Sequence, residues 1–291
     1  MDKLKPIDGA IGVGQRLGID TLLVTEDITN ANRQLIEKIL ESDGRNEVDI
    51  SRIYWFVRLY GTCGVGTKIG GKDSIYGTVG GLVFRYSKGE KQVCALTCGH
   101  VAVHVLDSGI MHLSDISIPL LSDSVLFCER NEENIAAIVL GETVQNKITL
   151  SGEFNTAYGK RKQCDLFSYK QINDKQPVDL LSGVVVYLRG ASTSLGFGRI
   201  TSSFYMIKLS QVMICFEDVE PGQPFCQPGD SGAIICRDVG DKTEAIAMLY
   251  GEALVQDNAE SRKIYFGFKL ESGLEALSRK HGQFILIQDK V

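Results

Sequence analysis

From residue 61 onward, short apolar runs alternate with turns that contain glycine. Residues 77–84 and 92–97, for example, flank a polar turn at residues 87–90. Two apolar runs around such a turn predict a β-hairpin. The chain holds 31 glycines and only 6 prolines among 291 residues, which suits many short strands joined by tight turns. The sequence therefore predicts an all-β fold for this part of the chain.

Residues 1–60 have a different pattern. Within residues 30–42, apolar side chains recur at helical spacing with charged residues between them, which is typical of an amphipathic helix. Gly44 predicts the end of that helix, and the apolar run at residues 53–59 predicts a strand. We expect an N-terminal extension over residues 1–60 that packs against the β domain. A small regulatory appendage is the alternative.

Composition argues against several classes of partner. The net charge is −5 and the chain has no basic stripe, so neither a nucleic acid nor an anionic membrane is the expected partner. No apolar run has the length of a membrane span, and the first residues lack the apolar core of a secretory signal. These observations predict a cytoplasmic protein.

The eight cysteines are expected to be reduced and mostly buried, because no secretory signal is found. No two of them have the Cys-x-x-Cys spacing of zinc sites. His100 and His104 have the spacing His-x-x-x-His, but Val101 stands where zinc peptidases of that spacing carry a glutamate. The sequence therefore predicts no metal and no cofactor.

Residues 226–232 place a serine between glycines in a predicted turn. The hydroxyl of Ser231 is a weak nucleophile until a neighbouring base takes its proton. Glycines on both sides allow a positive φ and a close approach to a substrate. The N–H groups of Gly229 and Ser231 would then form an oxyanion hole. The same four letters also occur in ordinary turns, so a histidine and a carboxylate upstream are needed.

Candidates for both are present. Residues 96–101 close an apolar run and deliver His100 just past a predicted strand end. Asp165 opens a short apolar strand after a basic loop, whereas the other aspartates considered between His100 and Ser231 do not. A strand edge would hold a carboxylate in place to fix the tautomer of the histidine. The carboxylates set aside in favour of Asp165 are Asp107, Asp115 and Asp123.

The order His100, Asp165, Ser231 resembles that of trypsin-like serine peptidases. Residues 184–200 and 227–232 resemble motifs of the streptogrisin-type members, and residues 245–251 resemble the strand that lines the family's substrate cleft. The resemblance covers roughly residues 75–280. No arginine–isoleucine–valine–glycine–glycine activation site is present, which indicates a non-zymogen type.

The resemblance implies a chymotrypsin-like fold of two antiparallel six-stranded β-barrels. The peptidase domain would span residues 61–291, with the first barrel at about 61–170 and the second at about 178–270. A C-terminal helix is expected at about residues 272–281, where a capping-box pattern opens it and His281-Gly282 closes it.

The implied activity is that of a serine endopeptidase acting through an acyl-enzyme. His100 would accept the proton of Ser231, and Asp165 would orient the imidazole. The family's substrate is a protein or peptide, which would pair as an added strand with the residues that border the cleft. By resemblance those residues are Tyr250, Gly251 and Glu252.

Three departures from the family pattern matter. Ala233 follows the Gly-Asp-Ser-Gly motif, Tyr250 stands where a small residue is typical, and Asp230 must find a partner other than a newly cut N-terminus. Because a fold does not guarantee activity, the alternatives are a latent or inactive binding or sensor module on a peptidase scaffold, or a non-peptidase hydrolase.

Overall fold

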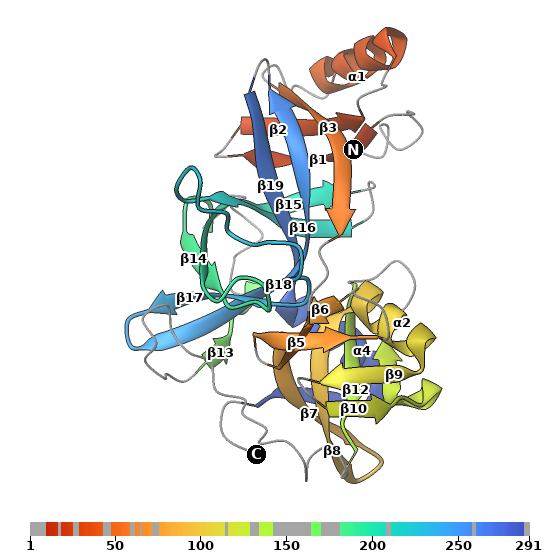
Figure 1. Ribbon diagram of the computed structural model, residues 1–291. Coiled ribbons are helices and arrows are strands. Elements are labelled where there is room, and N and C mark those ends of the chain that lie inside the picture. Colours follow the sequence, from red (N-terminus) through yellow and green to blue (C-terminus); the bar gives the residue numbers. More distant parts are fainter. Residues whose placement is uncertain are drawn as a thin grey trace.

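The computed structural model describes most of the chain, and the described part is largely β-structure with three α-helices (Figure 1). Among these residues no helix is both long and apolar enough to cross a membrane. The described residues are 10–16, 19–25, 29–42, 48–58, 62–64, 66–71, 76–113, 116–128, 134–141, 164–169, 181–207, 211–257 and 260–287.

The C-terminal half contains a closed barrel of six antiparallel strands. The strands follow the order β14, β15, β16, β19, β18, β17, and β17 pairs with β14 to close the ring. A short strand, β13 (Cys164–Leu166), runs parallel to β18 outside the ring. The barrel strands are β14 (Val185–Leu188), β15 (Gly196–Ile207), β16 (Gln211–Asp218), β17 (Ile234–Val239), β18 (Lys242–Asp257) and β19 (Glu260–Lys269).

Aromatic side chains fill part of this barrel. Phe216, Phe225 and Tyr265 are completely buried. The ring of Phe225 lies 5.6 Å from that of Phe216 and 5.6 Å from that of Tyr265, centroid to centroid. Such contacts contribute about 0.5–1.5 kcal/mol each beyond the area they bury. The barrel interior is thus a packed core.

Among the described residues, the N-terminal half forms two sheets of five strands each. The C-terminal barrel is closed, and the predicted first barrel stays a prediction. The predicted hairpin is present: β7 and β8 meet at a turn in which Lys88 and Gly89 both have positive φ. One sheet contains β7 (Gly81–Ser87), β8 (Glu90–Cys98), β11 (Val125–Phe127), β12 (Ile135–Val139) and β20 (Gln283–Leu286). The other contains β4 (Thr62–Gly64), β5 (Thr67–Gly70), β6 (Tyr76–Thr78), β9 (Ile110–Leu113) and β10 (Ile116–Pro119).

Three further elements lie in this half. The helix α2 (Gly99–Ser108) begins directly after β8, and the 3-10 helix η2 (Ser122–Ser124) precedes β11. The C-terminal helix α4 (Leu270–His281) matches the predicted one at residues 272–281. It returns the chain to the first half, where β20 pairs with β7.

The N-terminal extension is joined to the barrel by strand pairing. The predicted helix over residues 30–42 is α1 (Asn30–Ser42). It follows β1 (Ala10–Arg16) and β2 (Ile19–Thr25), and it precedes β3 (Val48–Arg58). The strand β1 pairs with β15, and β3 pairs with β18. In Figure 1 these strands lie beside the upper ends of β18 and β19.

The two halves approach each other backbone to backbone at Gly80. A Cβ atom on Gly80 would lie 2.2 Å from the carbonyl oxygen of Gly232 and 2.8 Å from Cγ1 of Ile234. Close by, the Thr78 N–H donates to the Ser231 carbonyl at 2.6 Å. A side chain at residue 80 would therefore push apart the β7–β8 hairpin and the turn that holds Ser231.

We expect Gly80→Ala to destabilise the fold by about 1–3 kcal/mol, the usual range for overpacking. The reason is that its new methyl group meets a backbone carbonyl, which cannot turn aside as a side chain can. Urea unfolding measures the change. Gly141→Ala is the control, because a Cβ there meets nothing within 4 Å. Equal stabilities of the two variants would contradict this account of the junction.

Candidate active site

The turn that carries Ser231 is held by the buried carboxylate of Asp230. Its Oδ1 accepts from the N–H groups of Ser192 at 2.8 Å and Thr193 at 3.1 Å. Its Oδ2 accepts from the N–H of Gln227 at 2.8 Å. Asp230 is completely buried, and three donors offset the cost of burying its charge. The partner that the sequence left open for Asp230 is thus the backbone of residues 192–193, together with that of Gln227.

Glycines permit this arrangement at two points. A Cβ on Gly190 would lie 2.2 Å from Oδ1 of Asp230, so no side chain fits where the carboxylate docks. Gly229 has φ +124°, a conformation that other residues rarely adopt. Its carbonyl accepts from the hydroxyl of Thr78 at 2.9 Å, and that hydroxyl in turn accepts from the Ala191 N–H. The N-terminal half therefore helps to fix the turn.

Backbone N–H groups in the turn divide into two sets. The Asp230 N–H donates to the Gln227 carbonyl, and the Gly232 N–H donates to the Leu249 carbonyl. Within the part of the chain that the structure describes, the N–H groups of Gly229 and Ser231 have no acceptor. Two N–H groups without partners on either side of Asp230 are available to bind an oxygen that carries negative charge.

Ser231 is completely buried. Its hydroxyl donates to the backbone carbonyl of Tyr250 at 2.8 Å. Tyr250 is the extra residue of a β-bulge, since the β18–β19 register shifts between Leu249 and Gly251. Bulges re-aim groups next to active sites. The Tyr250 ring packs edge-on against the imidazole of His100, with centroids 5.3 Å apart, so Tyr250 contacts two of the three predicted catalytic residues.

His100 lies in the first turn of α2 and is held by Asn134, the residue just before β12. The Oδ1 atom of Asn134 is 3.0 Å from the His100 backbone nitrogen and 3.1 Å from ring Nδ1. The Gly99 N–H donates to the Asn134 carbonyl at 2.8 Å. These contacts satisfy N–H groups that a helix start leaves without intrahelical acceptors.

The contact with the backbone determines how the Asn134 amide is oriented. A backbone N–H can only donate, so the Asn134 atom facing it must be the carbonyl oxygen. The same oxygen faces ring Nδ1 of His100, and this contact favours the tautomer that carries its proton on Nδ1. This tautomer leaves Nε2 as the basic nitrogen of the imidazole, which is the form that a general base requires.

The structure places Asp165 elsewhere. It lies on β13, where it pairs in register with Glu244 of β18. Its Oδ2 accepts from Nζ of Lys242 at 2.8 Å, in an ion pair whose side chains are 52% and 35% exposed for Lys242 and Asp165. The carboxylate raises the pKa of Lys242 by hydrogen bonding and charge. Among the described residues, the side chain that contacts the His100 ring through a polar atom is that of Asn134, whereas Asp165 pairs with Lys242.

Sequence reasoning missed Asn134 because it searched for a carboxylate. The local pattern was nevertheless informative, since Asn134 directly precedes the apolar run of β12. That strand pairs antiparallel with β8, and Ile135 lies opposite Cys98. The pairing brings the residue before β12 beside the residues that follow β8, which include His100.

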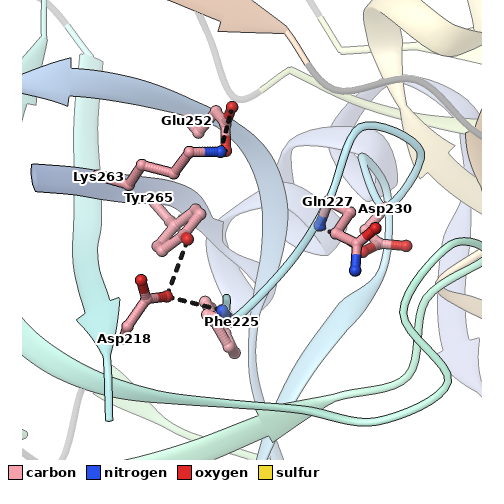
Figure 2. A network of polar contacts seen from close by, with 7 residues as sticks. All are labelled: Asp218, Phe225, Gln227, Asp230, Glu252, Lys263 and Tyr265. Carbon is pink, nitrogen blue, oxygen red and sulfur yellow. Dashed lines mark hydrogen bonds and ion pairs between the residues drawn. The ribbon is translucent and has the colours of Figure 1, made fainter. Parts of the chain in front are cut away.

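Near the turn that holds Ser231, two groups of polar contacts lie among the barrel strands (Figure 2). Lys263 donates to both carboxylate oxygens of Glu252, at 3.1 and 3.0 Å, and Glu252 is 3% exposed. Oδ1 of Asp218 accepts from the Tyr265 hydroxyl at 2.8 Å and from the Phe225 N–H at 2.7 Å. Glu252 was predicted to border the substrate cleft, and here Lys263 neutralises the charge of its carboxylate.

The described residues include no candidate metal centre, and two of the buried thiols have raised pKa values. Among them, no three His, Cys, Asp or Glu side chains are grouped as a metal ion would require. The seven cysteines whose side chains the structure describes form no disulfide bond with one another. Burial raises the pKa of the Cys226 thiol, and the charge of Asp230 adds to the effect. Burial also raises the pKa of Cys94 to about 12, so these thiols stay protonated and unreactive near neutral pH.

The sequence matches no known family model, and no curated protein matches it. Among solved structures, a glutamic-acid-specific serine protease that uses a histidine triad in substrate binding is similar, with a TM-score of 0.46 and 13% identity over 72% of this chain and 95% of that one. Thermobifida fusca protease A gives a TM-score of 0.44 and 15% identity over 78% and 100%. Cellulomonas bogoriensis chymotrypsin gives 0.44 and 14% over 79% and 100%.

We expect Asp230→Asn to destabilise the protein by about 1.5–3 kcal/mol, the range for a hydrogen bond to a charged group. An amide of the same shape turns one N–H group towards backbone donors that need an acceptor. Urea unfolding at neutral pH measures the loss. Asp107→Asn, on the exposed side of α2, is the control and should change stability by less than about 0.5 kcal/mol. A similar effect of both substitutions would refute the role given to Asp230.

Proposed function

We propose that this protein is a serine-type peptidase in which Ser231 is the nucleophile and His100 the general base. The observation that carries the proposal is the turn at residues 229–231. It places two unpartnered N–H groups beside Ser231, at the point where Tyr250 contacts both Ser231 and His100. An acyl-transfer site needs these parts: a hydroxyl, a base and donors for the oxyanion. Its substrate would be a protein or peptide.

The proposed reaction begins when the Ser231 hydroxyl leaves the Tyr250 carbonyl and turns to Nε2 of His100. Nε2 takes the proton while Oγ attacks the peptide carbonyl carbon, and the N–H groups of Gly229 and Ser231 bind the resulting oxyanion. The imidazolium then protonates the leaving amine. Water, deprotonated by the same imidazole, releases the acid and restores Ser231. General acid–base assistance of this kind contributes roughly 10²–10⁴ in rate.

Asn134 is the proposed positioning residue for His100. In the template triad, replacing the carboxylate by an amide costs about 10⁴ in kcat because the histidine takes the wrong tautomer. Here the His100 backbone N–H orients the amide so that its oxygen selects the correct tautomer. Cysteine peptidases of the papain type use a His–Asn pair in the same sense. Because an amide carries no charge, it stabilises the imidazolium less than a carboxylate would.

A fluorophosphonate probe tests the nucleophile. We expect the wild-type protein to be labelled at Ser231, and we expect Ser231→Ala and His100→Ala to abolish labelling, because one lacks the hydroxyl and the other the base. Intact-protein mass spectrometry gives the stoichiometry, and thermal unfolding shows whether each variant is folded. A well-folded wild-type protein that is not labelled would refute the assembled site and favour a binding module on a peptidase scaffold.

Substitutions of Asn134 test the positioning role. We expect Asn134→Leu, similar in size but without an acceptor, to lower the labelling rate about tenfold or more, and Asn134→Asp to restore or exceed the wild-type rate, since it keeps the oxygen and adds a charge. Nitrogen-15 NMR of the imidazole provides a readout that does not require activity. The wild type should show protonated Nδ1, and Asn134→Leu should show a mixture of tautomers. A wild-type imidazole protonated at Nε2 would contradict the assignment.

A further inference from the structure

One edge of β18 carries three elements in succession. The strand β17 pairs with β18 from Lys242 to Met248. At the next residue, Leu249, this edge pairs with the turn that holds Ser231. The Gly232 N–H donates to the Leu249 carbonyl, and the Leu249 N–H donates to the Ala233 carbonyl. Beyond Tyr250, the strand β3 pairs with β18 from Gly251 to Gln256. The opposite edge belongs to β19 from Ala247 onward.

The strand β3 is therefore adjacent to the nucleophile along this edge. It runs antiparallel to β18, and its last residue, Arg58, pairs with Gly251, next to Tyr250. Its C-terminal end thus points towards the turn that holds Ser231. In Figure 1 the orange arrow of β3 is directed towards the junction of the barrel with the N-terminal sheets. An extended peptide with its acyl side directed at Ser231 would have the same direction.

We propose that β3 of this chain is an autoinhibitory strand: it occupies the β18 edge from Gly251 to Gln256, where an extended peptide substrate would otherwise pair. Main-chain hydrogen bonds bind a peptide added to a sheet edge, and an edge already paired with β3 has no such bonds to offer. The complete burial of Ser231 in this state agrees with a closed site. The consequence for catalysis rests on the proposed function, whereas occupancy of the edge does not.

The pairings of β3 allow its release to be tested selectively. Residues 48–53 of β3 pair with β2, whereas among the described strands residues 55–58 pair with β18 alone. Proline has no N–H and is excluded from the interior of paired strands. N–H groups alternate in direction along a strand, so Phe56→Pro together with Val57→Pro removes a ladder donor whichever of the two points at β18. The double variant Phe56→Ala/Val57→Ala keeps both N–H groups and is the matched control.

Hydrogen exchange and peptide binding are measured on the full-length variants. We expect the amides of residues 251–256 to exchange at least tenfold faster in the double-proline variant than in the double-alanine control. A fluorescent peptide with the sequence of residues 52–58 should bind the double-proline variant at least tenfold more tightly than the double-alanine control. The bound peptide should also restore the protection of amides 251–256 from exchange. Unchanged exchange in a folded double-proline variant, or no difference in peptide binding, would overturn the proposal.

A reversible disulfide between β3 and β18 provides a second test if the double-proline variant does not fold. Phe56 lies opposite Ala253, so Phe56→Cys/Ala253→Cys should form a cross-strand disulfide. We expect the oxidised protein to react with a fluorophosphonate at least tenfold more slowly than the same protein after reduction, and equal rates would overturn the autoinhibition. If exchange and peptide binding behave as expected but no form is labelled, the peptide site stands and the proposed peptidase function fails.

Discussion

The arrangement of the candidate site depends on the buried carboxylate of Asp230. A charge without exposure to water is tolerated only when donors surround it, and here three backbone N–H groups do so. Two of them come from residues 192–193, which follow the barrel strand β14. The turn at residues 227–232 is therefore fixed by contacts within the folded chain. The carboxylate of Asp230 thus finds its donors in the backbone of the turn and of residues 192–193.

The histidine side of the site has a different organisation. The amide of Asn134 contacts both the backbone and the ring of His100, so a single oxygen caps the start of α2 and selects a tautomer. Gly99 permits the contact, because a Cβ there would lie 3.2 Å from that same oxygen. A carboxylate at this position would stabilise the imidazolium more strongly. In the proposed mechanism, the amide orients the imidazole without adding a charge.

Local sequence patterns predicted local structure well. The β7–β8 hairpin follows from two apolar runs around a polar turn, and α1 and α4 follow from helical periodicity and end signals. The pattern around Ser231 identified a turn because glycine tolerates positive φ there. The local pattern that selected Asp165 is not specific, because many short apolar runs follow a polar residue. The pairing of β12 with β8 shows that the run preceded by Asn134 is the one beside His100. That pairing joins distant segments, so no local propensity encodes it.

The pairing of β3 with β18 was equally hidden, and it changes how the N-terminal extension is understood. A run of apolar residues predicts a strand but not the edge to which the strand binds. Because β3 pairs with β18, the N-terminal extension, the turn that holds Ser231 and β17 all lie along one edge of β18. The position of Ser231 between these two strands is consistent with its complete burial. Any peptide that reaches Ser231 along this edge must first displace β3, so the stability of the β3–β18 pairing sets the threshold for access.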